Sequence, residues 1–169
     1  MVITEVICRI KSKIKSFYDM FIDTPKVWRR LQKCDVLIYD KCGSEALAPY
    51  LEKYKIEVLP VRGEYINLYC LLHAIFKINF WIGKPLKAYL ETYIALSSPR
   101  LCITFIDNNA SFYTISDSQP DLKTMLLQNG LRDDWLVAHT DKRLYTVDFM
   151  LVFNKNIGYK WKDCFSRIT

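Results

Sequence analysis

The stretch LCITFIDNNASFYTIS, residues 101–116, sets a short apolar run directly before three consecutive polar side chains. Its first part has the β-branched and aromatic residues of a buried strand, and SFYTIS, residues 111–116, reads as the beginning of a short helix. Asp107, Asn108 and Asn109 lie at the transition. We therefore predict a strand over residues 100–107 that ends in a polar turn and continues into a helix.

The same alternation of strand and helix patterns runs through the rest of the chain. Further strands are predicted over residues 35–40, 56–61, 122–128 and 147–154, and helices over residues 45–54, 65–77, 86–95 and 155–165, with a loop over 78–85. Short strands that are apolar on both sides and separated by helices are typical of a parallel sheet covered on both faces. We predict an α/β fold: a Rossmann-like three-layer sandwich with a mainly parallel five-stranded sheet in the order 3-2-1-4-5 and helices on both faces.

The N-terminal segment has a different pattern. Its apolar residues recur at spacings of four and three, the period of an amphipathic helix: Ile3, Ile7, Ile10, Ile14, Phe17 and Phe21. Residues 1–34 hold eight basic and three acidic side chains, whereas the other 135 residues hold 16 and 15. We expect residues 1–33 to form a basic amphipathic helix with a connector, and residues 34–169 to form a single Rossmann-like domain. Because the basic excess is confined to one segment, without a repeated basic–aromatic pattern, we expect no nucleic-acid partner.

The cysteine and histidine positions argue against a metal site and against a disulfide framework. Six cysteines are dispersed without a C-x-x-C pair, and there are only two histidines. We expect no metal and reduced, mostly buried thiols, as in cytoplasmic proteins. No secretory signal is recognisable. The most apolar stretch, residues 65–81, contains four polar side chains and is shorter than the ~20 apolar residues of a membrane span.

In an open parallel sheet, ligands bind outside the carboxyl ends of the strands, where the strand order reverses. The loops predicted at this edge are residues 40–44, 62–64, 107–111, 128–132 and 154–156. The first loop lacks the glycine patterns of a dinucleotide site or a phosphate loop, so no cofactor is expected. It offers Gly43 for a tight turn, Ser44 as a helix N-cap, and Lys41 for an anion near a helix N-terminus. The alternative is that Ser44 merely caps its helix and Lys41 is solvated.

The loop at residues 107–111 is the most polar of the five. One residue suffices to cap a helix, but Asp107, Asn108 and Asn109 are followed by Ser111. The spare acceptors and amide donors suit sugar hydroxyls or a general base. A capped helix start and a substrate-binding loop therefore remain two open readings of this segment.

Two further loops carry candidate binding residues. Gln128, Asn129 and Gly130 follow the fourth predicted strand, with Arg132 close behind them, and leave the same two readings open. Glu64 follows the second predicted strand, where it could accept hydrogen bonds from ribose hydroxyls or cap the next helix.

Several of these segments resemble a known family when taken in order. They are VLIYDKCGSEALAPYLEKY, VRGEYIN, ITFIDNNASFYTIS, LLQNGLRDD and DFMLVFNKNIGYK. Together they resemble the N-terminal half of bacterial surface carbohydrate biosynthesis proteins, over about residues 34–160. These look like glycosyltransferases of the two-Rossmann-domain (GT-B) type that build capsule or lipopolysaccharide glycans.

The resemblance implies an activated-sugar transferase at the cytoplasmic face of the inner membrane, with a sugar or lipid-linked saccharide as acceptor. In such folds the N-terminal domain mostly holds the acceptor, and the C-terminal domain binds the nucleotide-sugar donor. For an inverting member, Asp107 would be the first candidate for the catalytic base by position. The chain departs from the family pattern because it ends where the second domain would begin.

We therefore expect an acceptor-side domain that is inactive without a separate donor-binding domain or chain. The alternative is a non-catalytic carbohydrate-binding or protein-interaction domain of the same fold. A small nucleotide-binding enzyme is disfavoured by the missing glycine fingerprint. The N-terminal helix either contacts an anionic leaflet, with Phe17, Phe21, Phe80 and Trp81 at the interface, or packs across the sheet edge with its lysines in water.

Overall fold

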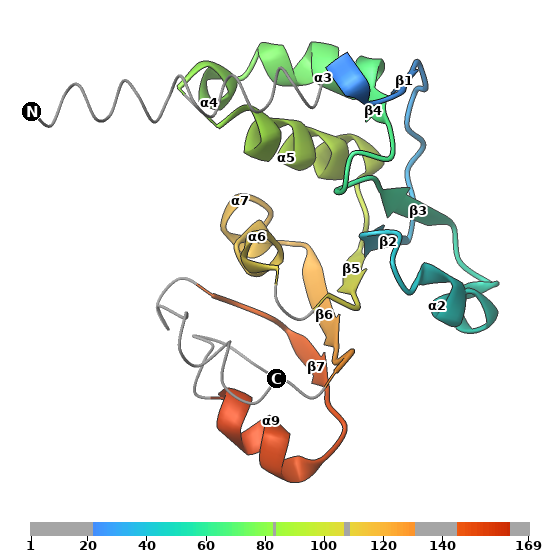
Figure 1. Ribbon diagram of the computed structural model, residues 1–169, viewed down its shortest axis with the longest axis vertical. Helices are drawn as coiled ribbons and strands as arrows, with labels where there is room; N and C mark the ends of the chain where they lie inside the picture. The colour runs from blue at the N-terminus through green and yellow to red at the C-terminus, as the bar shows by residue number, and fades with distance from the viewer. Residues whose placement is uncertain (1–21, 83, 107–108, 131–144, 163–169) are drawn as a thin grey trace, which may run out of the picture. The chain divides into compact units, whose positions relative to one another are not determined.

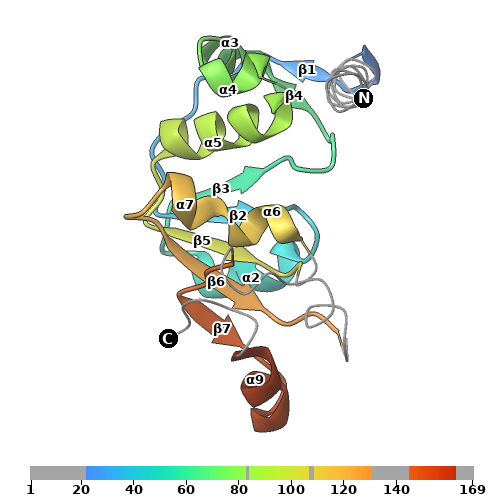
Figure 2. The same cartoon turned by 90° about the vertical axis from the view of Figure 1, so that its left-hand side faces the viewer.

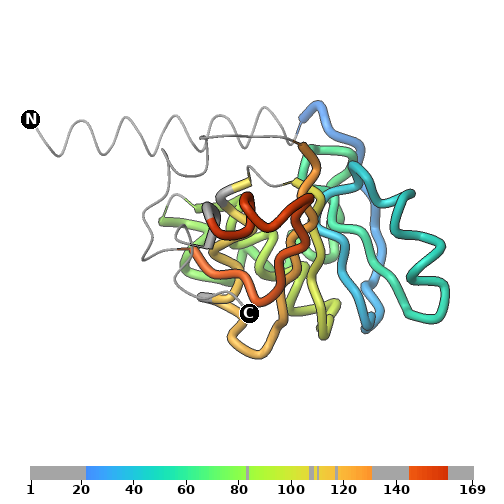
Figure 3. The backbone as a smooth tube through the Cα atoms, turned by 90° about the horizontal axis from the view of Figure 1, so that it is seen from below, coloured from blue at the N-terminus to red at the C-terminus, as the bar shows by residue number. Residues whose placement is uncertain are grey.

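A computed structural model describes residues 22–82, 84–106, 109–130 and 145–162 (Figure 1; Figure 3). The chain divides into two compact units, Met1–Gln32 with Pro60–Ser97, and Lys33–Leu59 with Ser98–Thr169. Residues 60–97, which we expected inside the 34–169 domain, thus group with the N-terminal segment. The amphipathic helix predicted over residues 3–21 lies outside the described residues.

The second unit contains the parallel sheet. Its strands are β2 (Val36–Tyr39), β3 (Ile56–Leu59), β5 (Leu101–Thr104), β6 (Lys123–Leu127) and β7 (Phe149–Leu151). They lie in the order β3-β2-β5-β6-β7, and every neighbouring pair is parallel (Figure 1). All five predicted strands are present, and the predicted α/β class with a parallel five-stranded sheet is confirmed.

The predicted strand order is wrong. In chain order the sheet reads 2-1-3-4-5, because β5 pairs directly with β2, from Val36 opposite Leu101 to Ile38 opposite Ile103. The burial of the strands explains this arrangement. Cys102, Ile103 and Thr104 are buried and suit a central strand, whereas Ile56 of the edge strand β3 is exposed. The strand order therefore reverses between β2 and β5, which are neighbours in the sheet.

Helices cover both faces of this sheet, as predicted (Figure 2). On one face, Val36, Ile38 and Ile103 form a core cluster with Leu51 of α2 (Ser44–Leu51). On the other face, Tyr39 makes an edge-on contact with Phe112, with ring centroids 5.4 Å apart. Phe112 belongs to α6 (Ala110–Tyr113), which is followed by α7 (Ile115–Ser118). These two short helices occupy the segment where one short helix was predicted.

The face that carries α2 is only partly covered. Beside α2 lies an open groove of about 790 Å³. Its walls are mostly apolar and include Tyr50 and Tyr54 from the α2 segment and Leu101, Met125, Leu127 and Leu151 from the sheet. The register places Leu151 of the edge strand opposite Leu127, so the groove extends to the β7 edge.

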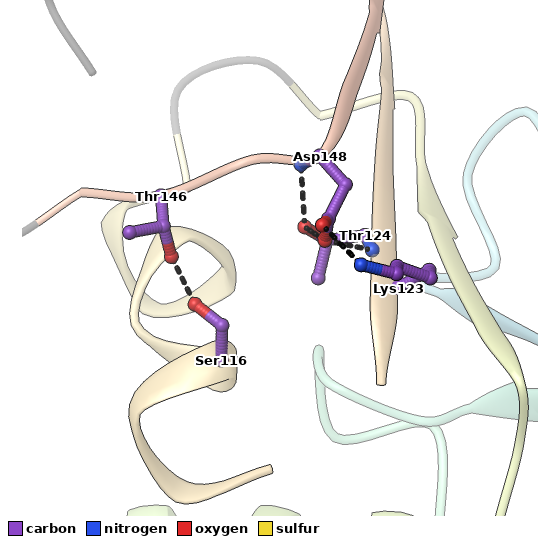
Figure 4. Close-up of polar contacts among 5 residues, drawn as sticks. All are labelled: Ser116, Lys123, Thr124, Thr146 and Asp148. Carbon is purple, nitrogen blue, oxygen red and sulfur yellow. Dashed lines mark hydrogen bonds and ion pairs between the residues drawn. The ribbon is translucent and has the colours of Figure 1, made fainter. Parts of the chain in front are cut away.

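A buried carboxylate fixes the beginning of β7 on β6 (Figure 4). Asp148 is 3 % exposed, and its Oδ2 accepts hydrogen bonds from the Thr124 backbone N–H at 2.9 Å and the Thr124 hydroxyl at 3.1 Å. Its Oδ1 lies 3.1 Å from Lys123 Nζ. The Ser116 and Thr146 hydroxyls also form a hydrogen bond, which ties α7 to the segment before β7. This network lies at the amino ends of the strands, opposite the ligand edge.

The final helix of the described chain follows β7. It is α9 (Lys155–Lys162), and the Asn154 side chain accepts a hydrogen bond from Ile157 N–H at 3.1 Å at its beginning. A helix was predicted over residues 155–165, of which residues 163–165 lie outside the described part.

The first unit is a small helical assembly with a short sheet. Its elements are β1 (Lys26–Val27), β4 (Ile66–Asn67), α3 (Leu68–Ile75), α4 (Ile78–Trp81) and α5 (Pro85–Ser97). The parallel pair β1–β4 was not predicted, and the helix expected over residues 65–77 begins only after Asn67, whose side chain caps α3. The predicted loop 78–85 contains α4 and the first residue of α5. Within the described residues, no helix has the length and apolar character needed to cross a membrane.

Buried polar side chains hold the first unit together. Asn67 is fully buried; its Nδ2 donates to the Arg29 carbonyl at 2.8 Å, and its backbone N–H donates to the Tyr89 hydroxyl at 3.0 Å. The Arg29 guanidinium donates to the hydroxyls of Tyr65 and Tyr93, at 3.1 and 2.9 Å. The segment after β1 is therefore bound to both β4 and α5.

Candidate functional site

The ends of β2 and β5 meet where the strand order reverses. Gly43, in the loop after β2, has a φ of 80°, and a Cβ at this position would lie 3.0 Å from the ring of Phe105. Phe105 directly follows β5. Because a side chain at residue 43 would meet this ring, the two loops are in contact. This contact joins the predicted loop 40–44 to the residue that follows β5, at the carboxyl edge of the sheet.

The loop after β2 is shaped by backbone conformation. Asp40 is 2 % exposed with a φ of 89°, and its Oδ1 accepts a hydrogen bond from Cys42 N–H at 2.9 Å. Gly43 occupies the N-cap position of α2, so the prediction that Ser44 is the cap is wrong. Ser44 is instead the first helical residue, because the left-handed turn needed before the helix falls on glycine. Lys41 is exposed, and its carbonyl accepts from Ser44 N–H.

The loop after β5 is held at both ends by polar side chains. The Thr104 hydroxyl donates to the Tyr39 carbonyl at 3.1 Å and accepts from Ile106 N–H at 3.0 Å, which joins the ends of the two central strands. Asp107 and Asn108 lie outside the described residues. Asn109 Oδ1 accepts from Ser111 N–H at 3.0 Å, so Asn109 is the N-cap of α6. Ser111 itself is exposed.

Gln128 has a structural role in the loop after β6. It is 6 % exposed, its Nε2 donates to the Gly130 carbonyl at 2.8 Å, and its Oε1 accepts from Phe153 N–H at 3.0 Å. Both ends of the amide are therefore used to join the exits of β6 and β7. Asn129 is exposed, and Arg132 lies outside the described residues.

Glu64 belongs to the first unit, whereas the five-stranded sheet belongs to the second unit. Its carboxylate accepts a hydrogen bond from Arg62 N–H at 3.0 Å, across a turn in which Gly63 has a φ of 79°. Asn67, not Glu64, caps α3.

The segments after β2, β5 and β6 therefore carry three exposed polar side chains, the ammonium of Lys41, the hydroxyl of Ser111 and the amide of Asn129. Ammonium, hydroxyl and amide groups are chemically able to form hydrogen bonds with hydroxyl-rich or anionic ligands. Within the described part of the chain, no group of three or more His, Cys, Asp or Glu side chains could hold a metal ion.

The fold and the position of this edge define a doubly wound α/β domain with its candidate site at the switch point between β2 and β5. No protein-family model matches the chain, and neither a curated protein nor a solved structure with detectable similarity is found.

Three buried acidic groups predict how stability responds to alkali. Burial raises the pKa of the Cys102 thiol above its ordinary value of 9.0, and it raises the pKa of the Tyr39 and Tyr89 hydroxyls above 10.0. The folded protein therefore keeps these protons at pH values where the unfolded chain releases them. This stabilising contribution is fully present below about pH 8 and is lost as the pH rises above about 9, by up to about 1.4 kcal/mol per pH unit for each group.

Urea unfolding between about pH 7 and pH 10.5 measures this effect. Cys102→Ala is expected to move the onset of the decline to higher pH, because only the two tyrosines then remain. A free energy of unfolding that is independent of pH up to about 10.5 would contradict the prediction.

Proposed function

We propose that the second unit is the acceptor-side domain of a glycosyltransferase for cell-surface polysaccharides. The observation that supports this proposal most is the contact between Gly43 and Phe105, which brings the loops after β2 and β5 together at the switch point. Ligands of open α/β sheets bind at such a point. The family resemblance of the same two loops selects a saccharide among the possible ligands.

In this reaction the chain's own groups would bind and activate the acceptor. Lys41, Ser111 and Asn129 supply exposed hydrogen-bonding groups for a sugar or for the phosphate of a lipid-linked saccharide. Asp107, by its place after β5, takes the proton of the acceptor hydroxyl while that oxygen attacks the anomeric carbon of the donor sugar. The nucleoside diphosphate leaves with the electrons of the broken bond. A separate domain or chain binds the nucleotide sugar.

The setting proposed for this reaction is the cytoplasmic face of the inner membrane. The basic N-terminal segment, with eight basic and three acidic residues among its first 34, would be attracted to an anionic leaflet. The protein and a lipid-linked acceptor would then be held at the same membrane.

A second candidate function is a non-catalytic carbohydrate-binding or interaction domain. The side chains of Asn109 and Gln128 favour it, because local hydrogen bonds already occupy the Asn109 oxygen and both ends of the Gln128 amide. Fewer side-chain polar groups at the carboxyl edge of the sheet are then free to contact a substrate than the number of polar residues in these loops suggests.

Nuclear magnetic resonance titration with oligosaccharides released from lipopolysaccharide and capsule tests the proposed site. Shifts are expected in the loops after β2 and β5, and Lys41→Ala should weaken binding about fivefold, the loss of roughly one hydrogen bond. Lys55→Ala is the matched control, because Lys55 is equally an exposed lysine but precedes β3 at the opposite edge. Shifts confined to the amino edge, or no shifts, would refute the proposal.

A transfer assay separates the two candidate functions. Membranes from cells that express the protein would be supplied with labelled nucleotide sugars. Under the glycosyltransferase proposal, Asp107→Ala and Asp107→Asn both abolish label transfer while the melting temperature stays nearly unchanged. Sugar binding without any dependence of transfer on Asp107 would support the non-catalytic function instead.

A further inference from the structure

The helices α3 and α4 of the first unit expose a dense group of large apolar side chains. We call Leu72, Phe76, Ile78, Trp81 and Ile82 the α3–α4 patch; they are 43, 84, 76, 68 and 56 % exposed. All five lie within 11 consecutive residues. Single exposed apolar residues are ordinary, but such a concentration marks an interaction surface.

Among the described residues, the patch lies on the outer side of α3 and α4. Leu72 lies on α3 four residues before Phe76, the C-cap residue with helical backbone angles, and Ile78 and Trp81 are three residues apart on α4. Each pair therefore shares one side of its helix. The inner side of α3 is already buried, because Cys70 and Ala74 are both 0 % exposed. Within the described residues, the side of α3 that packs into the core is therefore distinct from the side that carries the patch.

The indole of Trp81 is held in place while its ring stays in solvent. Its Nε1 donates to the Ile75 carbonyl at 2.7 Å, at the end of α3. Its ring also contacts Phe80 edge-on, with centroids 5.5 Å apart. A side chain that is fixed before binding loses less conformational entropy when it is buried by a ligand.

The residues of the patch lie in a part of the sequence that carries only positive charge. No acidic residue occurs between Glu64 and Glu91, whereas Lys77, Lys84 and Lys87 all lie in this interval. Lys84 and Lys87 are exposed, and Lys87 also forms an ion pair with Glu91 at 3.7 Å.

The two units of the chain differ in net charge. The unit that carries the patch has 11 basic and 5 acidic residues, whereas the other unit has 13 of each, so the whole net charge of +6 belongs to the first unit. The apolar surface therefore belongs to the unit that attracts anions.

We propose that the α3–α4 patch binds the surface of an anionic lipid bilayer. The aromatic and aliphatic side chains enter the boundary between headgroups and acyl chains, and Lys77, Lys84 and Lys87 meet lipid phosphates. A lipid surface fits better than a protein surface because lysine is depleted at protein–protein interfaces but is common beside membrane-interface aromatics. The inference stands on the first unit alone and does not depend on the sugar chemistry proposed for the second.

Co-sedimentation of the full chain with vesicles tests this proposal. The vesicles are phosphatidylcholine alone or phosphatidylcholine mixed with phosphatidylglycerol. The wild-type chain should bind the mixed vesicles more tightly, and added salt should weaken that binding. Phe76→Ser with Ile78→Ser, at the two most exposed patch positions, should weaken binding to mixed vesicles about tenfold or more. Lys84→Glu should also weaken it about tenfold, by replacing an attraction with a repulsion.

The second unit supplies matched controls for both changes. Tyr50→Ser alters an apolar side chain that is 80 % exposed, and Lys53→Glu reverses an exposed lysine; neither should change vesicle binding. Unchanged binding of the Phe76→Ser/Ile78→Ser variant would overturn the proposal. Sedimentation velocity without vesicles tests whether the Phe76→Ser/Ile78→Ser variant loses a self-association that the wild-type chain shows. If the variant loses self-association but still binds vesicles, the proposal is also overturned, because the patch would then bind a second copy of the chain.

Discussion

Replacing Asp148 by alanine is expected to lower the free energy of unfolding by about 3 kcal/mol. The carboxylate is 3 % exposed and accepts bonds from the Thr124 N–H, the Thr124 hydroxyl and Lys123 Nζ. Alanine would leave the two Thr124 donors buried without this acceptor, and each such donor costs roughly 1–3 kcal/mol. Lys123 adds less, because its side chain is 54 % exposed and can turn to water. Urea unfolding followed by circular dichroism measures the loss.

Three variants separate the buried network from a general effect of removing charge. Asp121→Ala removes an exposed carboxylate two residues before Lys123 and should change stability by less than about 0.5 kcal/mol. Asp148→Asn keeps the shape of the side chain and one acceptor oxygen. Its loss in the free energy of unfolding should therefore lie between the losses expected for Asp148→Ala and Asp121→Ala. Thr124→Val together with Asp148→Ala should cost less than the sum of the single changes, because they share hydrogen bonds. A loss below about 1 kcal/mol for Asp148→Ala would show that the network contributes little.

The five strands could be predicted from the sequence because buried strands contain short runs of consecutive apolar residues. Residues 36–39 and 101–104 are apolar on both faces, and such runs need only a sheet with two covered sides. The order of the strands in the sheet produces no local sequence pattern of this kind. It depends on which strand lies beside β2, and the connection between β3 and β5 is long enough to allow either arrangement. That connection forms part of a separate unit with its own core around Asn67 and Tyr89, which no short pattern indicates.

The candidate site was only partly predictable for a related reason. The polar loops after β2, β5 and β6 could be located, since the strands that precede them are recognisable. The roles of Asn109 and Gln128 could not be decided, because a cap bond to Ser111 N–H and a bond from Phe153 N–H depend on how the backbone turns. The Lys123–Thr124–Asp148 network was missed entirely. Asp148 lies 25 residues after Lys123 and 24 after Thr124, and an aspartate before a strand has no distinctive pattern.

The α4 segment is a helix in a stretch that was predicted as a loop. INFWIGKP, residues 78–85, was predicted as a loop; it is short and contains Gly83 and Pro85. Ile78–Trp81 nevertheless forms one helical turn, with the Ile82 N–H bonded to the Ile78 carbonyl at 3.2 Å. Glycine and proline mark the end of a helix as well as a loop, and four residues are too few to show a helical period.

Gly43→Val is the second change with a large expected effect, a loss of about 3 kcal/mol in the free energy of unfolding. A β-branched residue is strained at the φ of 80° that this turn requires, and its Cβ would begin 3.0 Å from the Cγ and Cδ2 atoms of Phe105. The loss thus has two parts, one from the backbone and one from crowding. Gly130→Val is the matched control. Apart from its chain neighbours, no atom of the described residues lies within 4 Å of a Cβ at position 130, so the change should cost less than about 0.5 kcal/mol.

Combining Gly43→Val with Phe105→Ala separates the two parts and tests the contact on which the candidate site is built. Removing the ring relieves the crowding but not the backbone strain, so the double variant should be more stable than the sum of the single losses predicts, by about 1–2 kcal/mol. Thermal unfolding of the four proteins gives this coupling energy. Additive losses would mean that residues 43 and 105 do not touch in solution. The segments after β2 and β5 would then not contact each other, and the candidate site at the switch point would not be one continuous surface.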